Sequence, residues 1–281
     1  MYYPYFRGKQ YDLLALKNLL ESDMLSQSIQ PIIEPVKQSK TFWSLIELLA
    51  QKNHPCFIID NPSAGDFLTD DGLQELAAIP LRKARIVDQP IETYETQPDM
   101  FIIHQAEAAL ESDWSNNQLP TLLSKEFRLL NHVQGPKIIM EDPFTRLPKN
   151  SFYTEYETEL FSSRKKTYES LGFAGYCDFS IDSKIYYSSS YPSKRIAIHW
   201  LFPDDFDDLR IIHLVSDEDL ATQKEKFLQV MVQLADHEQL FPTQTLGLQL
   251  LQESVQQNKF PGMGIIRKAS VMNHLELASR M

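Results

Sequence analysis

Short apolar runs recur along the chain, and each one stops at an acid, an amide or a histidine. They are QPIIEP (30–35), CFIIDNP (56–62), ARIVDQP (84–90), MFIIHQ (100–105), KIIMEDP (137–143), YCDFSI (176–181), RIAIHW (195–200) and LRIIHLVSD (209–217). Runs this short that are rich in Ile, Val and Phe are typical of buried strands. Helical segments lie between several of them, so the pattern predicts α/β layers with polar groups at the carboxyl ends of the strands.

Helical spacing of apolar residues predicts the helices. They are expected over 9–25, 39–51, 70–79, 106–112 and 151–172, and then over about 219–236, 243–257 and 264–279. Ser39 is the expected cap of the second helix, and Pro80 ends the third because proline removes a backbone donor. Gly172 closes the long, charged helix over 151–172, whereas residues 119–133 fit either a helix or a strand.

The last third of the chain changes character. RIAIHWLF and DLRIIHLVSD flank the acidic turn PDDFDD, which predicts an antiparallel hairpin. Because no repeat or flexible linker interrupts the chain, we predict one α/β domain over residues 1–281. Its expected form is an irregular TIM-barrel-like domain with a mostly parallel sheet, followed by the hairpin and C-terminal helices. The polar, aromatic stretch over 184–194 is expected to be an exposed loop, a lid or a partner contact.

Composition narrows the classes of function. The net charge of −11 argues against general nucleic-acid binding, which needs clustered cations. The nine glycines form neither GxGxxG nor GxxxxGK[ST], so the two common glycine-rich phosphate loops are missing. No apolar stretch approaches 18 residues, and MYYPYFRGKQ lacks the apolar core of a signal peptide. With Cys56 and Cys177 expected as buried thiols, we predict a cytoplasmic protein without a membrane partner.

Several segments resemble a known family in their wording. They are YYPYFRGKQYDLLALKNL, IQPIIEPVK, IIHLVSD and the tail FPGMGIIRKASVMNHLELAS. Together they resemble an uncharacterised bacterial family that is carried on mobile elements and is distantly similar to the phage group called beta protein. The resemblance implies a TIM-barrel-like α/β fold and a gene that often lies beside a nuclease-like neighbour. It implies no reaction and no catalytic residues.

Acids at the predicted strand ends are the first candidates for chemistry. They are Glu34, Asp60, Asp88, Glu141, Asp142 and Asp178, of which Glu34 and Asp142 are favoured. In a parallel sheet several of these acids would meet at one rim, where paired carboxylates serve as general acid and base or hold Mg²⁺ or Mn²⁺. The alternative is that each acid caps a helix or pairs with a cation.

Histidines and cations complete the candidate set. His104, His199 and His213 end or interrupt apolar runs, where histidine serves as a proton shuttle or as a satisfied core residue. Their spacing carries no metal signature, so cofactor and metal stay unknown. The predicted catalytic set is Glu34, Asp60, Glu141, Asp142 and His199, and the predicted substrate-binding set is Arg7, Lys9, Lys37, His104 and His213.

Two classes of function follow from these observations. The first is an accessory component of a bacterial mobile-element or phage-conflict system that acts with a protein partner, for instance a nuclease-like one. The second is an enzyme that uses strand-end carboxylates, with or without a divalent metal, on a phosphate-containing or nucleotide substrate. The fold by itself does not choose between them.

Overall fold

The computed structural model describes residues 1–184, 194–241 and 244–280, in two compact units. The first unit comprises Met1–Leu13, Gln27–Asp142 and Arg164–Phe179, and the second comprises Leu14–Ser26, Pro143–Ser163 and Ser180–Met281. The boundary falls inside helix α1 (Gln10–Glu21). One domain over 1–281 stays a prediction, and the loop expected over 184–194 lies outside the described residues except for its two end lysines.

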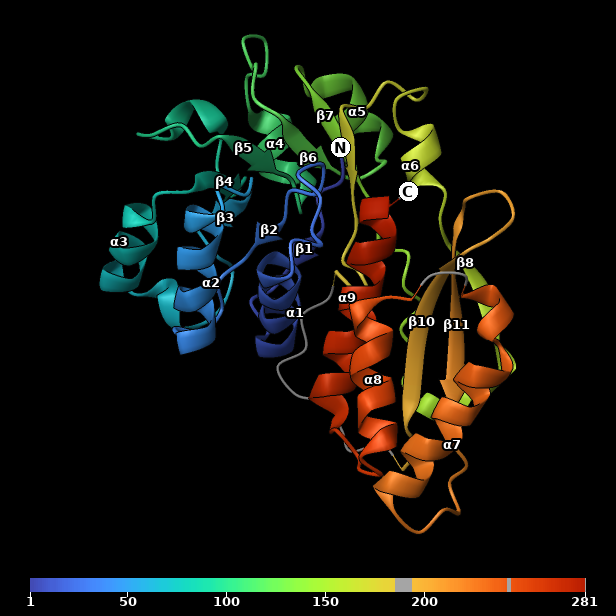
Figure 1. Cartoon of the computed structure of the whole chain (residues 1–281). Helices are drawn as coiled ribbons and strands as arrows, with labels where there is room; N and C mark the ends of the chain where they lie inside the picture. The colour runs from blue at the N-terminus through green and yellow to red at the C-terminus, as the bar shows by residue number, and fades with distance from the viewer. Residues whose placement is uncertain (185–193, 242–243, 281) are drawn as a thin grey trace. The chain divides into compact units, whose positions relative to one another are not determined.

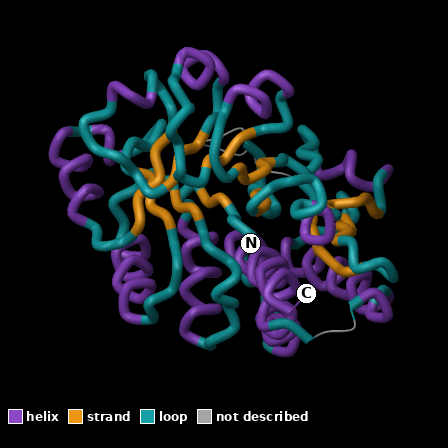
Figure 2. Tube along the Cα trace, turned by 90° about the horizontal axis from the view of Figure 1, so that it is seen from above, coloured by secondary structure: helices purple, strands orange, loops and turns teal. Residues whose placement is uncertain are grey.

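Eight short parallel strands form the sheet of the first unit, and each is hydrogen-bonded to the next in chain order. They are β1 (Tyr5–Phe6), β2 (Ile32–Ile33), β3 (Phe57–Ile59), β4 (Arg82–Ile86), β5 (Met100–Ile102), β6 (Thr121–Leu123), β7 (Lys137–Met140) and β9 (Gly175–Cys177). The last strand returns to the first, because Tyr2 bridges to Tyr176 and the N–H of Tyr5 donates to the carbonyl oxygen of Asp178 at 2.9 Å. The sheet is therefore a nearly closed barrel of the TIM type, as predicted, with helices around its strands (Figure 2).

Alternate side chains of these strands fill the barrel. One buried cluster draws on all eight strands, so it is the interior: Tyr3, Tyr5, Ile32, Phe57, Ile59, Ala84, Met100, Ile102, Leu122, Ile138, Met140, Cys177 and Phe179. Helices α2 (Lys40–Gln51), α3 (Asp70–Ala78), α4 (Ala106–Glu111) and α5 (Phe127–His132) follow strands β2, β3, β5 and β6. Ser39 caps α2 as predicted, since its hydroxyl accepts the N–H of Phe42 at 3.1 Å.

The sequence located most of these elements. All eight apolar runs overlap a strand, and residues 119–133 hold both a strand and a helix, β6 and α5. Strand β1 was missed because it is two residues long and follows Pro4. The short connection from β4 to β5 contains only a single 3₁₀ turn, η2 (Ile91–Thr93), which still joins two parallel strands.

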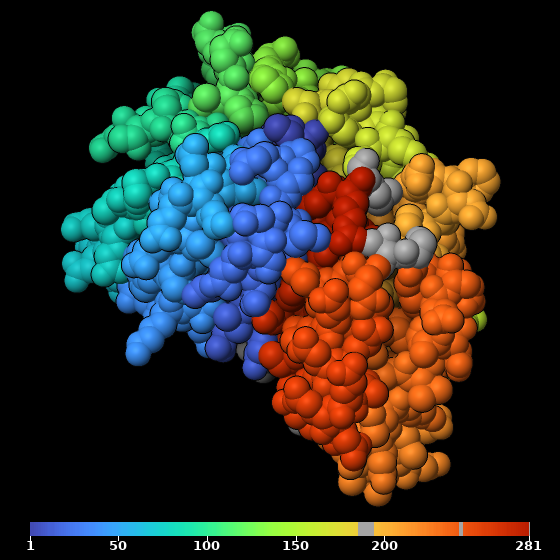
Figure 3. Space-filling view, viewed as in Figure 1, coloured from blue at the N-terminus to red at the C-terminus, as the bar shows by residue number. Residues whose placement is uncertain are grey.

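An antiparallel sheet organises the second unit. Strands β10 (Ala197–Pro203) and β11 (Leu209–Val215) form the predicted hairpin, and β8 (Thr158–Ser162) pairs with the far side of β11. Helices α7 (Gln223–Asp236), α8 (Leu246–Gln256) and α9 (Met263–Arg280) contribute to one apolar core with Ile198, Trp200 and Leu214 of the hairpin (Figure 1). In Figure 3 the side chains of α7 and α8, orange to red, form a continuous surface.

The helix predicted over 151–172 is wrong. The segment instead holds the 3₁₀ turn η3 (Asn150–Glu155), strand β8 and the single helical turn α6 (Arg164–Thr167). Its charged residues fit a helix, but Tyr, Thr and Phe favour strands, and pairing with β11 supplies backbone partners that no local pattern reveals. Glu159 and Phe161 thereby fall on the opposite side of the strand from Leu160.

Within the described residues, no helix has both the length and the apolar character needed to cross a membrane.

Candidate functional site at the carboxyl end of the barrel

Polar side chains follow the barrel strands at the point where each strand ends. Arg7 follows β1, Glu34 follows β2, Asp60 follows β3 and His104 lies just after β5. Because all eight strands are parallel, these residues lie at the same end of the barrel, which is where TIM-barrel enzymes place their sites. The sequence predicted that polar side chains would lie at this end of the barrel. The contacts in the structure show which of these side chains interact.

Glu34 is the centre of the closest network at this end. Its side chain is only 2% exposed. One carboxylate oxygen accepts the N–H of Ser63 at 2.9 Å and also the hydroxyl of Ser63. The other oxygen accepts the hydroxyl of Tyr5 at 2.8 Å, and Nε of Arg7 lies 3.6 Å from it. Four donor groups from three residues therefore surround one carboxylate.

These donors decide the charge of Glu34. Burial by itself raises the pKa of a carboxyl group, because it removes water from the charged form. The bonds from the Ser63 side chain and backbone and from Tyr5, together with the charge of Arg7, outweigh burial and hold the pKa of Glu34 below its ordinary value. Glu34 is therefore an anion at neutral pH, and it orients its neighbours rather than exchanging a proton.

His104 is the neighbour that Glu34 orients through Tyr5. The Tyr5 hydroxyl donates to Glu34, so its oxygen is left to accept a hydrogen bond. Nε2 of His104 lies 3.2 Å from that oxygen, and the two rings meet edge to face at 5.5 Å. His104 must therefore carry its hydrogen on Nε2, which makes Nδ1 the nitrogen that can exchange a proton. His104 as a residue is partly exposed, but its Nδ1 atom is buried, so a substrate must displace neighbouring groups to reach it.

Two glycines allow the backbone to approach this network. Gly8 has a φ of 54°, and a Cβ at this position would lie 3.0 Å from the carbonyl oxygen of Glu34. Gly65 has a φ of 106°, and its Cβ would lie 2.0 Å from the carbonyl oxygen of Val36. Both positions need a residue without a side chain. The glycine that follows Arg7 and the glycine near Ser63 thus bring these residues to Glu34.

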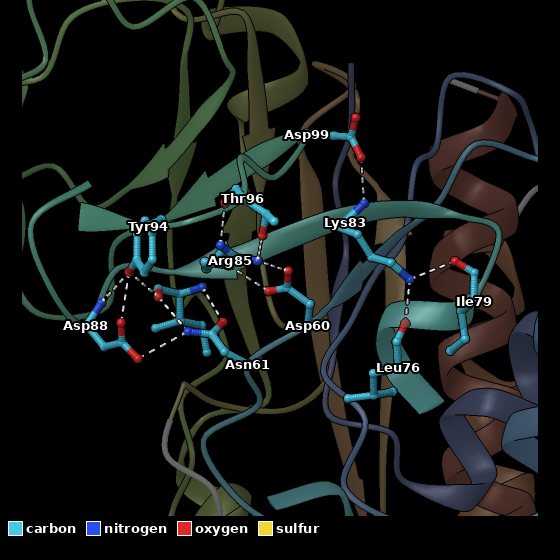
Figure 4. Close-up of polar contacts among 11 residues, drawn as sticks. Asp60, Asn61, Leu76, Ile79, Lys83, Arg85, Asp88, Tyr94, Thr96 and Asp99 are labelled. Carbon is cyan, nitrogen blue, oxygen red and sulfur yellow. Dashed lines mark hydrogen bonds and ion pairs between the residues drawn. The ribbon is translucent and has the colours of Figure 1, made fainter. Parts of the chain in front are cut away.

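Asp60 belongs to a separate polar group beside β4, drawn in Figure 4. It accepts two hydrogen bonds from Arg85, whose Nη1 also donates to the carbonyl oxygen of Thr96 at 2.6 Å. The bond to Asp60 raises the pKa of Arg85, which stays charged. Nearby, Asp88 accepts the hydroxyl of Tyr94 at 2.8 Å. Asp60 is thus held in an ion pair, as the alternative interpretation of the acids predicted.

The remaining predicted residues of the first unit are Glu141, Asp142, Lys9 and Lys37. Nε of Arg164 donates to Glu141 at 2.6 Å, and Nζ of Lys125 lies 3.9 Å from Glu141. Asp142 and Lys37 are exposed, and Lys9 is half-buried. Glu141, like Asp60, is therefore held by cations.

His199 and His213 lie in the second unit rather than on the barrel. They face each other across the β10–β11 hairpin, with Nδ1 of one ring 2.8 Å from Nδ1 of the other. The structure therefore sorts the predicted residues into groups: Arg7, Glu34 and His104 around Tyr5, and the histidine pair. In the parts of the chain that are described, no group of three or more His, Cys, Asp or Glu side chains could hold a metal ion.

Sequence reasoning missed Tyr5 and Ser63. Tyr5 lies in a strand that was too short to be recognised, and Ser63 lies in the loop NPSAGDF, which was assigned only as a turn. The signal for Ser63 was present, because a loop that follows a barrel strand returns over the carboxyl end.

No family model matches the chain, and no curated protein matches it. What this end of the barrel does must therefore follow from its own geometry.

Proposed function

We propose that the chain is an enzyme that binds a phosphate-containing or nucleotide substrate at the carboxyl end of its barrel and transfers a proton there through His104. The observation that carries the proposal is the ordered contact from Glu34 to Tyr5 to His104, at 2.8 and 3.2 Å. A base that is oriented by a second group, itself held by a buried anion, is the arrangement that general acid–base catalysis uses.

The cations at this end support the class of substrate. Arg7 is 12% exposed and lies against both Glu34 and the ring of Phe179. Its guanidinium is thus held in place, which favours recognition of an anion of fixed geometry. Lys9 follows β1, as Arg7 does, and Lys37 follows β2, as Glu34 does. Their positive charges would attract a phosphate group. Mg²⁺ and Mn²⁺ are compatible with a phosphate ligand and belong in the test.

A thermal-shift screen against nucleotides and sugar phosphates, each with and without Mg²⁺ or Mn²⁺, tests the proposal. A ligand present at about a hundred times its dissociation constant stabilises the fold by roughly 2.7 kcal/mol, which shifts the melting temperature by several degrees. We expect a saturable shift that Arg7→Gln removes. Arg82→Gln is the matched control, because Arg82 also lies over an aromatic ring, that of Phe57, but begins β4 at the opposite end of the barrel.

His104→Gln separates binding from chemistry. The amide can still donate to Tyr5, so binding should persist, while conversion of the bound ligand, followed by ³¹P NMR, should stop. His132→Gln serves as the control, since Nε2 of His132 lies 3.1 Å from the carbonyl oxygen of Ser112, to which an amide can also donate. The proposal fails if no compound shifts the melting temperature, or if Arg7→Gln and Arg82→Gln behave alike.

A second candidate function is that of an accessory component of a mobile-element or phage-conflict system, bound to a nuclease-like protein partner. The observation that favours it is strand β8, which is an edge of the three-stranded sheet. Phe152, Tyr156 and Leu160, on or just before this strand, are 42%, 54% and 52% exposed. Apolar side chains beside an open strand edge are typical of a surface that another chain covers.

Copurification with the product of a neighbouring nuclease-like gene tests this candidate. Leu160→Lys should weaken the complex at least about tenfold, because a desolvated apolar contact would be replaced by a charge. Leu171→Lys is a closely matched control, since Leu171 is 51% exposed and lies in the first unit. Equal loss in both variants, or no complex with the wild-type chain, would rule this candidate out.

A further inference from the structure

Three neighbouring strands of the second unit each place one ionisable side chain in a continuous hydrogen-bonded row. His199 on β10 and His213 on β11 are directly opposite in register, and their Nδ1 atoms are 2.8 Å apart. Nε2 of His213 lies 3.2 Å from Oε1 of Glu159 on β8. The hydroxyl of Thr145 donates to the other oxygen of Glu159 at 2.9 Å. The row therefore runs from Thr145 through Glu159 and His213 to His199.

Aromatic side chains enclose the inner part of this row. The ring of Tyr153 lies 4.5 Å from that of His199 and 4.7 Å from that of His213. Phe144 meets His199 edge to face at 5.0 Å. The side chain of His213 is 0% exposed, whereas His199 is partly exposed. The middle of the row, at His213, is thus closed off from water, whereas Glu159 and His199 on either side of it are partly exposed.

The hydrogen-bond partners determine the positions of the protons. A carboxylate can only accept, so Nε2 of His213 carries a hydrogen and donates to Glu159. A neutral His213 then has a bare Nδ1, which must accept the Nδ1 hydrogen of His199. Nε2 of His199 is therefore left with its lone pair, and no described residue is hydrogen-bonded to that nitrogen.

We propose that Glu159, His213 and His199 form a proton relay, and that Nε2 of His199 is its open acid–base site for a ligand or water molecule that donates a proton. When a proton binds to Nε2 of His199, the Nδ1 hydrogen of His199 moves to Nδ1 of His213. The positive charge then rests on the His213 imidazolium beside the Glu159 carboxylate. No electron is transferred, and the reverse movement releases the proton. This site is independent of the one proposed at the barrel end.

The groups around the relay keep it neutral at rest. Burial, together with the nearby His213 and Arg267 of α9, lowers the pKa of His199 to about 3. Burial also lowers the pKa of His213, although Glu159 opposes that change. On the remaining sides lie Tyr153 of η3 and Arg146 of the preceding loop, and Arg146 and Arg267 both pair with Asp182. At neutral pH both imidazole rings are therefore uncharged, and the relay can take up one proton.

The tautomers of the two rings test the inference directly. Long-range ¹H–¹⁵N correlation spectra of the ¹⁵N-labelled full chain at pH 7 distinguish a bare ring nitrogen from a protonated one. We expect His199 with hydrogen on Nδ1 and His213 with hydrogen on Nε2, assigned with His199→Gln and His213→Gln. Hydrogen on Nε2 of His199 in the folded wild-type chain would overturn the relay.

Chemical reactivity supplies a second readout. Diethyl pyrocarbonate acylates a bare, accessible imidazole nitrogen, so peptide mass spectrometry should find His199 modified and His213 unmodified. Glu159→Leu removes the group that selects the tautomer, so the two tautomers should become comparable and the rate at His199 should fall roughly twofold. Glu157→Leu is the control, because Glu157 is two residues away and its carboxylate contacts His237 instead. Equal effects of the two variants, or modification of His213 at the same rate as His199, would contradict the proposal.

Discussion

The two units of this protein bury ionisable groups and treat them in opposite ways. At the carboxyl end of the barrel, Glu34 is 2% exposed and its pKa lies below the ordinary value. In the second unit, Glu276 is 0% exposed and its pKa lies above that value, chiefly because of burial. Burial lowers the pKa of both His199 and His213 in that same unit. The barrel thus keeps a buried charge, and the second unit favours the neutral forms of its buried groups.

The difference teaches that donors, not burial, decide the charge. Glu34 collects the N–H and hydroxyl of Ser63, the hydroxyl of Tyr5 and the nearby Arg7, so the charged form gains more than burial removes. Glu276 accepts the N–H of Leu246 at 2.6 Å, and it also pairs with Arg280. The side chain of Arg280 is 36% exposed, so water screens the attraction between the two charges.

The largest expected effect comes from breaking the charged region. Glu34→Ala removes the anion beside Arg7 and the acceptor of the Tyr5 and Ser63 donors, so the free energy of unfolding should fall by about 3–5 kcal/mol in urea denaturation. Glu34→Gln keeps an acceptor oxygen and should cost less, about 1.5–3 kcal/mol. Equal stability of Glu34→Ala and the wild-type chain would show that the network is not structural.

The histidine pair and Glu34 should lower the stability of the protein in different pH ranges. The histidines have an ordinary pKa of 6.5, which folding lowers, so the unfolded chain binds protons that the folded chain does not. Stability should therefore fall as the pH drops below about 6.5, on the order of 3 kcal/mol by pH 4. His199→Gln should flatten the curve in this window. The folded pKa of Glu34 is also lowered, from 4.5, so its stabilisation is lost only below about that pH, and Glu34→Gln should flatten only that part.

A smaller effect tests the cover over the histidine pair. The hydroxyl of Tyr153 accepts the N–H of Leu147 at 2.9 Å, and Tyr153→Phe leaves that donor without its partner. We expect a loss of about 1–2 kcal/mol of unfolding free energy. The ring contacts with both histidines remain in this variant, so the response to acid between pH 6.5 and 4 should be the same as in the wild-type chain. A changed acid response would mean that the hydroxyl takes part in the relay.

The smallest effect distinguishes the two buried glutamates. The raised pKa of Glu276 contributes stability that is complete below its unfolded pKa and is lost as the pH rises through the folded value. Glu276→Gln keeps an acceptor for Leu246 and has no charge to bury, so this loss above pH 4.5 should vanish. Thermal denaturation at several pH values measures it, with a difference below about 1 kcal/mol. A Glu276→Gln variant that still loses stability over this range would show that another group is responsible.

Much of this architecture was readable in the sequence, because it depends on local patterns. Buried parallel strands are short and almost wholly apolar, so six of the eight barrel strands were recognisable, all except β1 and β6. The pairing of His199 with His213 was also accessible, since the two residues are equally distant from Phe206 in the turn PDDFDD. By contrast, β8 was taken for a helix because an exposed edge strand carries charged residues, and its pairing with β11 is not local.

The sequence by itself determined the class of fold, the hairpin and the residues that stand at strand ends, since these follow from the periodicity of apolar side chains. Only the tertiary structure decided which of those residues act together. In the folded chain, Glu34 accepts hydrogen bonds from Tyr5 and Ser63, and Asp60 and Glu141 each pair with an arginine. Glu159 contacts one ring of the histidine pair. The physical reason is that a charge or a tautomer depends on donors brought from distant segments, and the distances between them exist only once the chain has folded.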